Sequence, residues 1–208
     1  APLEITDSEE EILDKISLVA KYLEMFVVFR CANRKNYGQS AIRYTMYSLV
    51  KEIRGKSLED LTTILSRKYS EFDVNLEGIN KLILHGQNKP FIKFLLARIT
   101  NFIERKCSRP SNFIDYISAT QKKPFEIEHI WCDKFEEHED EFSQRDDFKE
   151  YRNKIGALLL VQNGFNQSYN DLPYESKLEK YYGQNLLAQT LNTKCYENDP
   201  AFIKFKKD

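Results

Sequence analysis

Residues 125–131 read FEIEHIW, and residues 155–161 read IGALLLV. The first stretch alternates apolar and polar side chains with a period of two, which is typical of a β-strand. The second is an apolar run that is short enough for a strand. The polar residues 132–153 separate the two stretches, and helical spacing of apolar side chains resumes over residues 174–192. The sequence therefore predicts a strand, a long loop, a second strand and a helix, in this order.

The chain before this region has the spacing of amphipathic helices. Thr6 with Glu9 resembles a capping box that opens the first helix, and Ser57 with Asp60 starts another. Pro90 suits the first turn of a further helix. We therefore expect a mainly α-helical α+β protein, with an α-helical bundle over residues 1–110 and the strands, followed by C-terminal helices, over residues 111–208.

Composition excludes several classes of protein. The 31 basic and 32 acidic residues leave a net charge of −1, which excludes a histone-like polycation. The sequence contains no run of about 18 apolar residues, so we expect no membrane-spanning helix. The first residues show no secretory signal. The cysteines are widely spaced without a CxxC motif, which favours reduced thiols in a cytosol over a zinc site or a disulfide framework. They are Cys31, Cys107, Cys132 and Cys195.

Charge is unevenly distributed along the second half of the chain. Residues 81–125 carry nine Lys and Arg side chains against two acidic ones, whereas residues 126–151 carry eleven acidic side chains against three basic ones. A basic helical face beside an acidic segment can place a polyanion next to metal-binding carboxylates. Two solvated faces that neutralise each other explain the same pattern.

One of the three histidines stands out by its context. His129 comes late in the predicted strand, directly after Glu128, and Asn166 falls where a helix is expected to start after the second strand. In a strand–loop–strand–helix hairpin these three side chains can converge around one cation. Carboxylate and amide oxygens suit Mg²⁺ or Mn²⁺, and a neutral imidazole can deprotonate a water molecule. We expect His85 and His138 to be exposed and without a direct role.

These residues also carry a family resemblance. IEHIW followed by IGALLLVQNGFNQSYNDLPYESK resembles the HNH, or His-Me-finger, nuclease fold, in which a ββα-metal hairpin forms the site. Over residues 120–192 the chain is similar to the C-terminal nuclease domain of GmrSD-type proteins, found also in SspE-like anti-phage proteins. The resemblance implies a prokaryotic cytoplasmic endonuclease that restricts foreign DNA. It also implies a nucleotide-binding N-terminal half, of which this sequence shows no sign.

The resemblance implies roles for individual residues. His129 is expected to be the general base, and Glu128 and Asn166 are expected to bind a single Mg²⁺ or Mn²⁺. Lys177 matches a trailing lysine that we interpret as a phosphate or transition-state contact. An exposed helix lysine paired with Glu175 or Glu179 is the alternative interpretation of Lys177.

The sequence departs from the family pattern at two positions. Cys132 stands where proline is usual, which should alter the loop only slightly. Ala157 stands where the family has an asparagine that braces the loop carrying the base, and alanine cannot make those hydrogen bonds. Either Ala157 is an engineered, inactivating substitution, which the otherwise intact motif favours, or Asn163 or Asn153 compensates for a natural change.

DNA is the expected partner, with metal-dependent cleavage as the leading hypothesis. Two alternatives are a nuclease-like fold that binds DNA or protein without cutting, and a helical interaction module in which the first strand is only structural. Contacts to phosphates are expected from basic residues that position DNA without specifying its sequence. The candidates are Lys93, Arg105, Lys106, Lys122 and Lys123.

Overall fold

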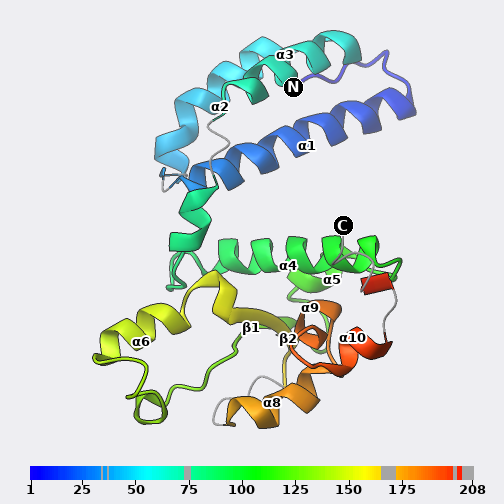
Figure 1. Ribbon diagram of the computed structural model, residues 1–208. Coiled ribbons are helices and arrows are strands. Elements are labelled where there is room, and N and C mark those ends of the chain that lie inside the picture. Colours follow the sequence, from blue (N-terminus) through cyan, green and yellow to red (C-terminus); the bar gives the residue numbers. More distant parts are fainter. Residues whose placement is uncertain (34, 37, 73–75, 165–171, 199–200, 203–208) are drawn as a thin grey trace. The chain divides into compact units, whose positions relative to one another are not determined.

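The computed structural model describes residues 1–33, 35–36, 38–72, 76–164, 172–198 and 201–202. Its contacts divide the chain into two compact units, residues 1–82 and 83–208, which we describe separately (Figure 1). The described residues form many helices and one two-stranded antiparallel sheet, so the mainly α-helical α+β prediction is confirmed. The division falls before the predicted boundary at residue 110, because helix α4 (Lys89–Lys106) packs against elements of the second unit.

The described residues of the N-terminal unit form three helices and a 3₁₀ helix. These are α1 (Glu9–Ala32), α2 (Gln39–Ile53), α3 (Leu58–Ser70) and η1 (Glu77–Lys81). Helix α3 packs against both α1 and α2, and η1 packs against α1. One apolar core joins the three helices, as their amphipathic spacing requires. Its buried members are Tyr22, Phe26, Leu49, Ile53, Leu61 and Leu65.

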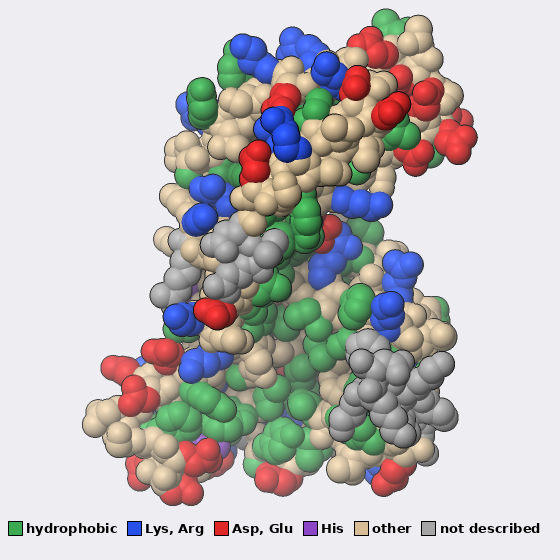
Figure 2. Space-filling model, turned by 45° about the horizontal axis from the view of Figure 1, so that its top comes forward, with side chains coloured by type: hydrophobic (Ala, Val, Ile, Leu, Met, Phe, Trp, Pro, Cys, Tyr) green, Lys and Arg blue, Asp and Glu red, His purple; other side chains and the backbone are tan. Residues whose placement is uncertain are grey.

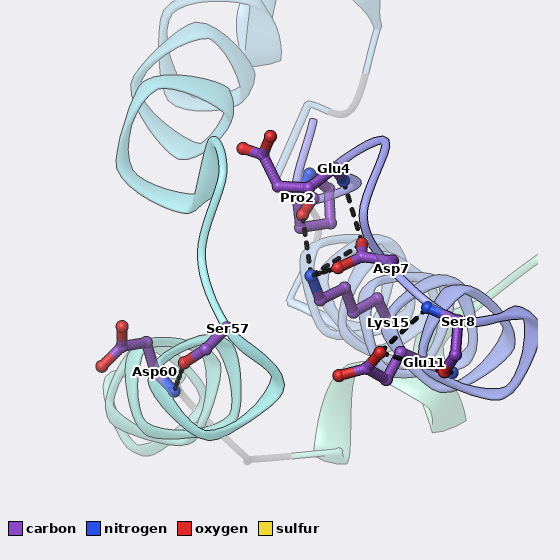
Figure 3. A network of polar contacts seen from close by, with 8 residues as sticks. All are labelled: Pro2, Glu4, Asp7, Ser8, Glu11, Lys15, Ser57 and Asp60. Carbon is purple, nitrogen blue, oxygen red and sulfur yellow. Dashed lines mark hydrogen bonds and ion pairs between the residues drawn. The ribbon is translucent and has the colours of Figure 1, made fainter.

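Helix starts in this unit were predicted with mixed success. Ser57 caps α3 as predicted, since its hydroxyl accepts a hydrogen bond from the main-chain N–H of Asp60 at 3.1 Å. The capping box of α1, however, is formed by Ser8 and Glu11, so the prediction of Thr6 and Glu9 was wrong. Glu11 N–H donates to Ser8 Oγ at 3.2 Å, and Ser8 N–H donates to Glu11 Oε2 at 2.9 Å (Figure 3).

A buried ammonium group secures the segment before α1. Lys15 Nζ donates to both carboxylate oxygens of Asp7, at 2.7 and 2.8 Å, and to the main-chain carbonyl of Pro2 at 3.3 Å (Figure 3). The hydrogen bond from Lys15 lowers the pKa of Asp7 below its usual range. Because a buried charge is costly unless it is paired, these contacts bind the segment before α1 to the helix.

The C-terminal unit is built around an antiparallel pair of strands. Strand β1 (Phe125–His129) pairs with β2 (Leu158–Gln162), in a register that runs from Phe125 opposite Gln162 to His129 opposite Leu158. The connection between them contains η2 (Phe135–Glu137), α6 (Arg145–Arg152) and η3 (Ile155–Ala157). The second strand therefore starts three residues later than the apolar run suggested, because residues 155–157 form a 3₁₀ turn.

Helices cover the hairpin. Helices α4 and α9 (Leu186–Gln189) pack against β2, and α5 (Phe113–Ile117) packs against α4 and β1. In Figure 1 the hairpin lies between α4 and α8 (Tyr174–Tyr181). The helix predicted over residues 174–192 is thus two helices, and a short helix, α10 (Lys194–Asn198), follows. None of the helices in the described residues has the length and apolar character that crossing a bilayer needs.

Substitutions of Ser8 and Thr6 should affect the stability of the protein differently. Replacing Ser8 with alanine removes the acceptor for the Glu11 N–H, and we expect a loss of about 1 kcal/mol in the free energy of unfolding. Thr6→Ala is the matched control and should change it little. Urea unfolding followed by circular dichroism measures both, and an equal or larger loss for Thr6→Ala would contradict the observed cap.

Candidate active site

The end of β1 places two adjacent side chains in different surroundings. Successive side chains of a strand point to opposite faces. Glu128 is accordingly buried, with 1% of its surface exposed, and contacts α8. His129 is half-buried and contacts the residue that ends α6. The strand thus separates the carboxylate from the imidazole that the sequence placed side by side.

Glu128 takes part in a buried ion pair. Its Oε1 accepts hydrogen bonds from Lys177 Nζ at 2.7 Å and from the Tyr181 hydroxyl at 3.2 Å. Lys177 and Tyr181 are one helical turn apart on α8, so both side chains reach the same carboxylate. Burial raises the pKa of Glu128, and the hydrogen bond and charge of Lys177 oppose this rise. The net effect is a pKa of Glu128 above its usual range, and the contacts with Lys177 and Tyr181 favour the ionised form against that burial.

Lys177 also binds the main chain of β1. Its Nζ donates to the carbonyl oxygen of His129 at 2.8 Å, and only 1% of the residue is exposed. The interpretation of Lys177 as an exposed lysine paired with Glu175 or Glu179 was therefore wrong, and Glu179 pairs with Lys194 instead. The predicted phosphate contact of Lys177 stays a prediction, one that requires the ammonium to leave this buried position.

An asparagine supports the imidazole of His129. His129 Nε2 lies 2.9 Å from Asn153 Oδ1, and Asn153 Nδ2 donates to the carbonyl of Lys149 at 2.7 Å. Because the amide nitrogen is committed to Lys149, the atom that faces the imidazole is an acceptor, so Nε2 carries the proton. Nδ1 accepts no hydrogen bond from the residues that the structure describes.

The surroundings of His129 favour the neutral imidazole over the imidazolium. Burial lowers the pKa of His129 below its ordinary 6.5, and the charges of Arg152 and Lys177 act in the same direction. The hydrogen bond with Asn153 and the charge of Asp133 oppose the decrease without outweighing it. A neutral imidazole with a lone pair on Nδ1 can accept a proton from a water molecule.

Ala157 lies next to this end of β1. Its carbonyl accepts a hydrogen bond from Ile130 N–H at 3.0 Å, directly beyond the last strand pair. Of the two asparagines considered as replacements, Asn153 contacts His129. Asn163 is at the other end of the hairpin, where its Nδ2 donates to Glu126 Oε1 at 2.9 Å. Of these two asparagines, Asn153 is thus the one at the His129 end of the hairpin, and compensation for Ala157 stays a prediction.

Of the two predicted metal ligands, Glu128 and Asn166, the structure describes Glu128. Asn166 lies outside the described residues, so its role as a ligand stays a prediction. Glu128 does not fit that role in the arrangement seen, because its carboxylate is buried and already neutralised by Lys177. Among the described residues there is also no group of three or more His, Cys, Asp or Glu side chains that could hold a metal ion.

The predicted DNA contacts belong to two segments of the C-terminal unit. Lys93, Arg105 and Lys106 are on α4, and Lys122 and Lys123 precede β1. All are exposed except Lys93, which is half-buried and whose pKa is lowered by that burial. None of these five side chains contacts His129 in the part of the chain that the structure describes. Their role in DNA binding stays a prediction.

The acidic segment is a surface feature. Acidic side chains gather on the surface around the connection between the strands, at the lower left of Figure 2. The exposed ones include Glu136, Asp140, Glu141, Asp146 and Asp147. His138 is half-buried there and stacks on Trp131 with ring centroids 4.6 Å apart, so the expectation that it is exposed was wrong. His85 is exposed, as expected.

Sequence reasoning missed two residues at this site. Tyr181 shares the carboxylate with Lys177, and the signal was available in their spacing of four residues on a predicted helix. Arg152 donates from Nε to the carbonyl of Trp131 at 2.9 Å and so fixes the chain just after His129. Arg152 had no sequence signal, because α6 lies in a stretch without a clear apolar period.

Comparison with models of known protein families gives a match. A family model described as GmrSD restriction endonucleases, C-terminal domain, matches residues 76–204, more than half of the chain. The matched segment includes both strands and all of the site residues considered above. No curated protein and no solved structure gives a significant match.

The ion pair of Glu128 should be essential for stability. Replacing Lys177 with methionine leaves a buried carboxylate without its partner, and we expect a loss of about 3–5 kcal/mol in the free energy of unfolding. Replacing both partners, as in Glu128→Leu with Lys177→Met, should recover much of the loss. Lys180→Met, at an exposed position of the same helix, is the control. Urea unfolding measures all three, and a Lys177→Met variant as stable as the control would contradict the buried pair.

Proposed function

The chain belongs to the family of the C-terminal domain of GmrSD restriction endonucleases, and from this membership we propose that it is an HNH-type, metal-dependent DNA endonuclease domain that acts in defence against foreign DNA. The observation that carries the proposal is the state of His129. It stands at the end of the first strand of a ββ hairpin, with Nε2 bound to Asn153 and Nδ1 left as a base.

In the proposed reaction the imidazole activates water. Nδ1 of His129 takes a proton from a water molecule, whose oxygen attacks the phosphorus of a phosphodiester. The bond from phosphorus to the 3′-oxygen breaks, and that oxygen takes a proton from solvent. The resulting imidazolium is stabilised by its hydrogen bond to Asn153 Oδ1, and it returns its proton to solvent before the next turnover.

One divalent cation, Mg²⁺ or Mn²⁺, remains part of the proposal. Such an ion would supply positive charge at the phosphate oxygens. Asn166 is the candidate metal ligand that the resemblance implies. Glu128 could bind the ion only after its ion pair with Lys177 had broken. No step proposed for the protein's own residues depends on Glu128.

DNA would be positioned by basic side chains of the C-terminal unit. Exposed Arg105 and Lys106 end α4, and exposed Lys122 and Lys123 precede β1. Contacts of this kind hold the phosphate backbone and lose strength as salt concentration rises. The acidic surface around α6 would repel the backbone, so we propose that DNA approaches over the basic segments.

Plasmid cleavage tests the proposed activity. Incubated with supercoiled plasmid and Mg²⁺ or Mn²⁺, the protein should convert it first to the nicked circle. His129→Ala should abolish this conversion and EDTA should prevent it, whereas His85→Ala, at an exposed position, should leave the rate unchanged. Binding without cleavage under all of these conditions would favour the non-cleaving alternative, and equal cleavage by His129→Ala would exclude His129 as the base.

The pH dependence of cleavage follows from the lowered pKa of His129. The base is active when neutral, so the rate should be independent of pH between about 7 and 8.5 and should fall as the pH decreases through a midpoint below 6.5. Rates measured over pH 5–9 under saturating cation test this. A midpoint clearly above 6.5 would assign the proton transfer to another group.

A further inference from the structure

We propose that Asn153 is the positioning residue of His129, and that it replaces the bracing asparagine which the family pattern has at the position of Ala157. This inference deepens the proposed nuclease function and rests on it for the role of His129. Which nitrogen of the imidazole carries the proton does not depend on whether the protein cuts DNA.

Asn153 is held more firmly than a surface asparagine would be. It ends α6, where its main-chain N–H donates to the carbonyls of Lys149 and Glu150 at 3.2 Å. Its own carbonyl accepts from the N–H of Leu84 at 2.8 Å, and an isolated bridge pairs Ile83 with the following residue, Lys154. The backbone of Asn153 is therefore fixed by two separate segments of the chain.

The side chain of Asn153 has only one way to face the imidazole. Nδ2 donates to the carbonyl of Lys149 at 2.7 Å, which leaves Oδ1 directed at His129 Nε2 at 2.9 Å. An amide oxygen only accepts, so Nε2 must donate. The contact both orients the ring and selects the tautomer in which Nδ1 has its lone pair available for water.

Positions 153 and 157 belong to the same short segment that leads back into β2. The Ala157 carbonyl accepts from Ile130 N–H, so residue 157 lies across from the residue that follows His129. The methyl group of Ala157 has no hydrogen-bonding capacity, whereas Asn153 reaches the imidazole itself. Support for the base has thus moved four residues along the segment, and Ala157 does not disable the site.

The tautomer of the His129 imidazole directly tests the positioning role of Asn153. In protein labelled with ¹⁵N-histidine, long-range ¹H–¹⁵N correlation spectra distinguish an Nε2–H from an Nδ1–H imidazole, and His129→Ala identifies the signal among the three histidines. We expect the Nε2–H form for the unmodified chain. Asn153→Ala should give a mixture of tautomers, while Asn153→Asp, which keeps an acceptor but loses the donor to Lys149, should retain Nε2–H.

Cleavage rates supply the second readout. Asn153→Ala should cut plasmid about 10- to 100-fold more slowly, the cost expected for a misplaced catalytic group. Adding Ala157→Asn to Asn153→Ala should restore part of the rate, whereas Ala157→Asn alone should change the rate little. Asn153→Asp should move the midpoint of the pH–rate curve upward, because a carboxylate stabilises the imidazolium.

These outcomes separate the two proposals. An Asn153→Ala variant with an unchanged melting temperature, an unchanged tautomer and an unchanged rate would overturn the positioning role. If the unmodified chain does not cut DNA, the proposed function fails. The tautomer spectra then still decide the positioning role: a mixture of tautomers in Asn153→Ala supports it, and an Nε2–H form as fully populated as in the unmodified chain overturns it.

Discussion

The ammonium of Lys177 lies between the Glu128 carboxylate and the carbonyl oxygen of His129, at 2.7 and 2.8 Å, and it joins α8 to the end of β1. Both ions are almost completely removed from water, so neither is tolerable without the other. Because neighbouring side chains of a strand alternate, fixing Glu128 toward α8 directs His129 to the other face, where α6 ends. The position of the imidazole is therefore a consequence of the buried ion pair.

Much of the fold follows from local sequence signals. The Ser57 cap, Pro90 in the first turn of α4 and the alternation over residues 125–131 each predicted an element that the structure has. The errors have physical causes. Thr6 was a plausible cap, but it lies in a turn that the Asp7 N–H closes on the Glu4 carbonyl, and α1 begins only after Ser8. Helix α6 lies in a highly polar stretch, where no apolar period reveals a helix.

The sequence pointed to the residues of the candidate site, and the contacts between them came from the structure. His129 was identified from its strand and its neighbours, and the family match covers it. Which residue meets Glu128 depends on packing between segments 49 positions apart, so the ion pair with Lys177 could not be read from the sequence. The choice between Asn153 and Asn163 likewise needed the strand register, which places the two asparagines at opposite ends of the hairpin.

The central claim is that Glu128 is an internal structural anion while His129 is the functional group of the same strand. A crystal structure of the protein grown with Mn²⁺, with the ion located by its anomalous scattering, tests this claim most directly. We expect Lys177 to remain within hydrogen-bond distance of Glu128, with the Mn²⁺ peak on the side of β1 that carries His129. A Mn²⁺ ion bound to the Glu128 carboxylate, with Lys177 displaced, would contradict it.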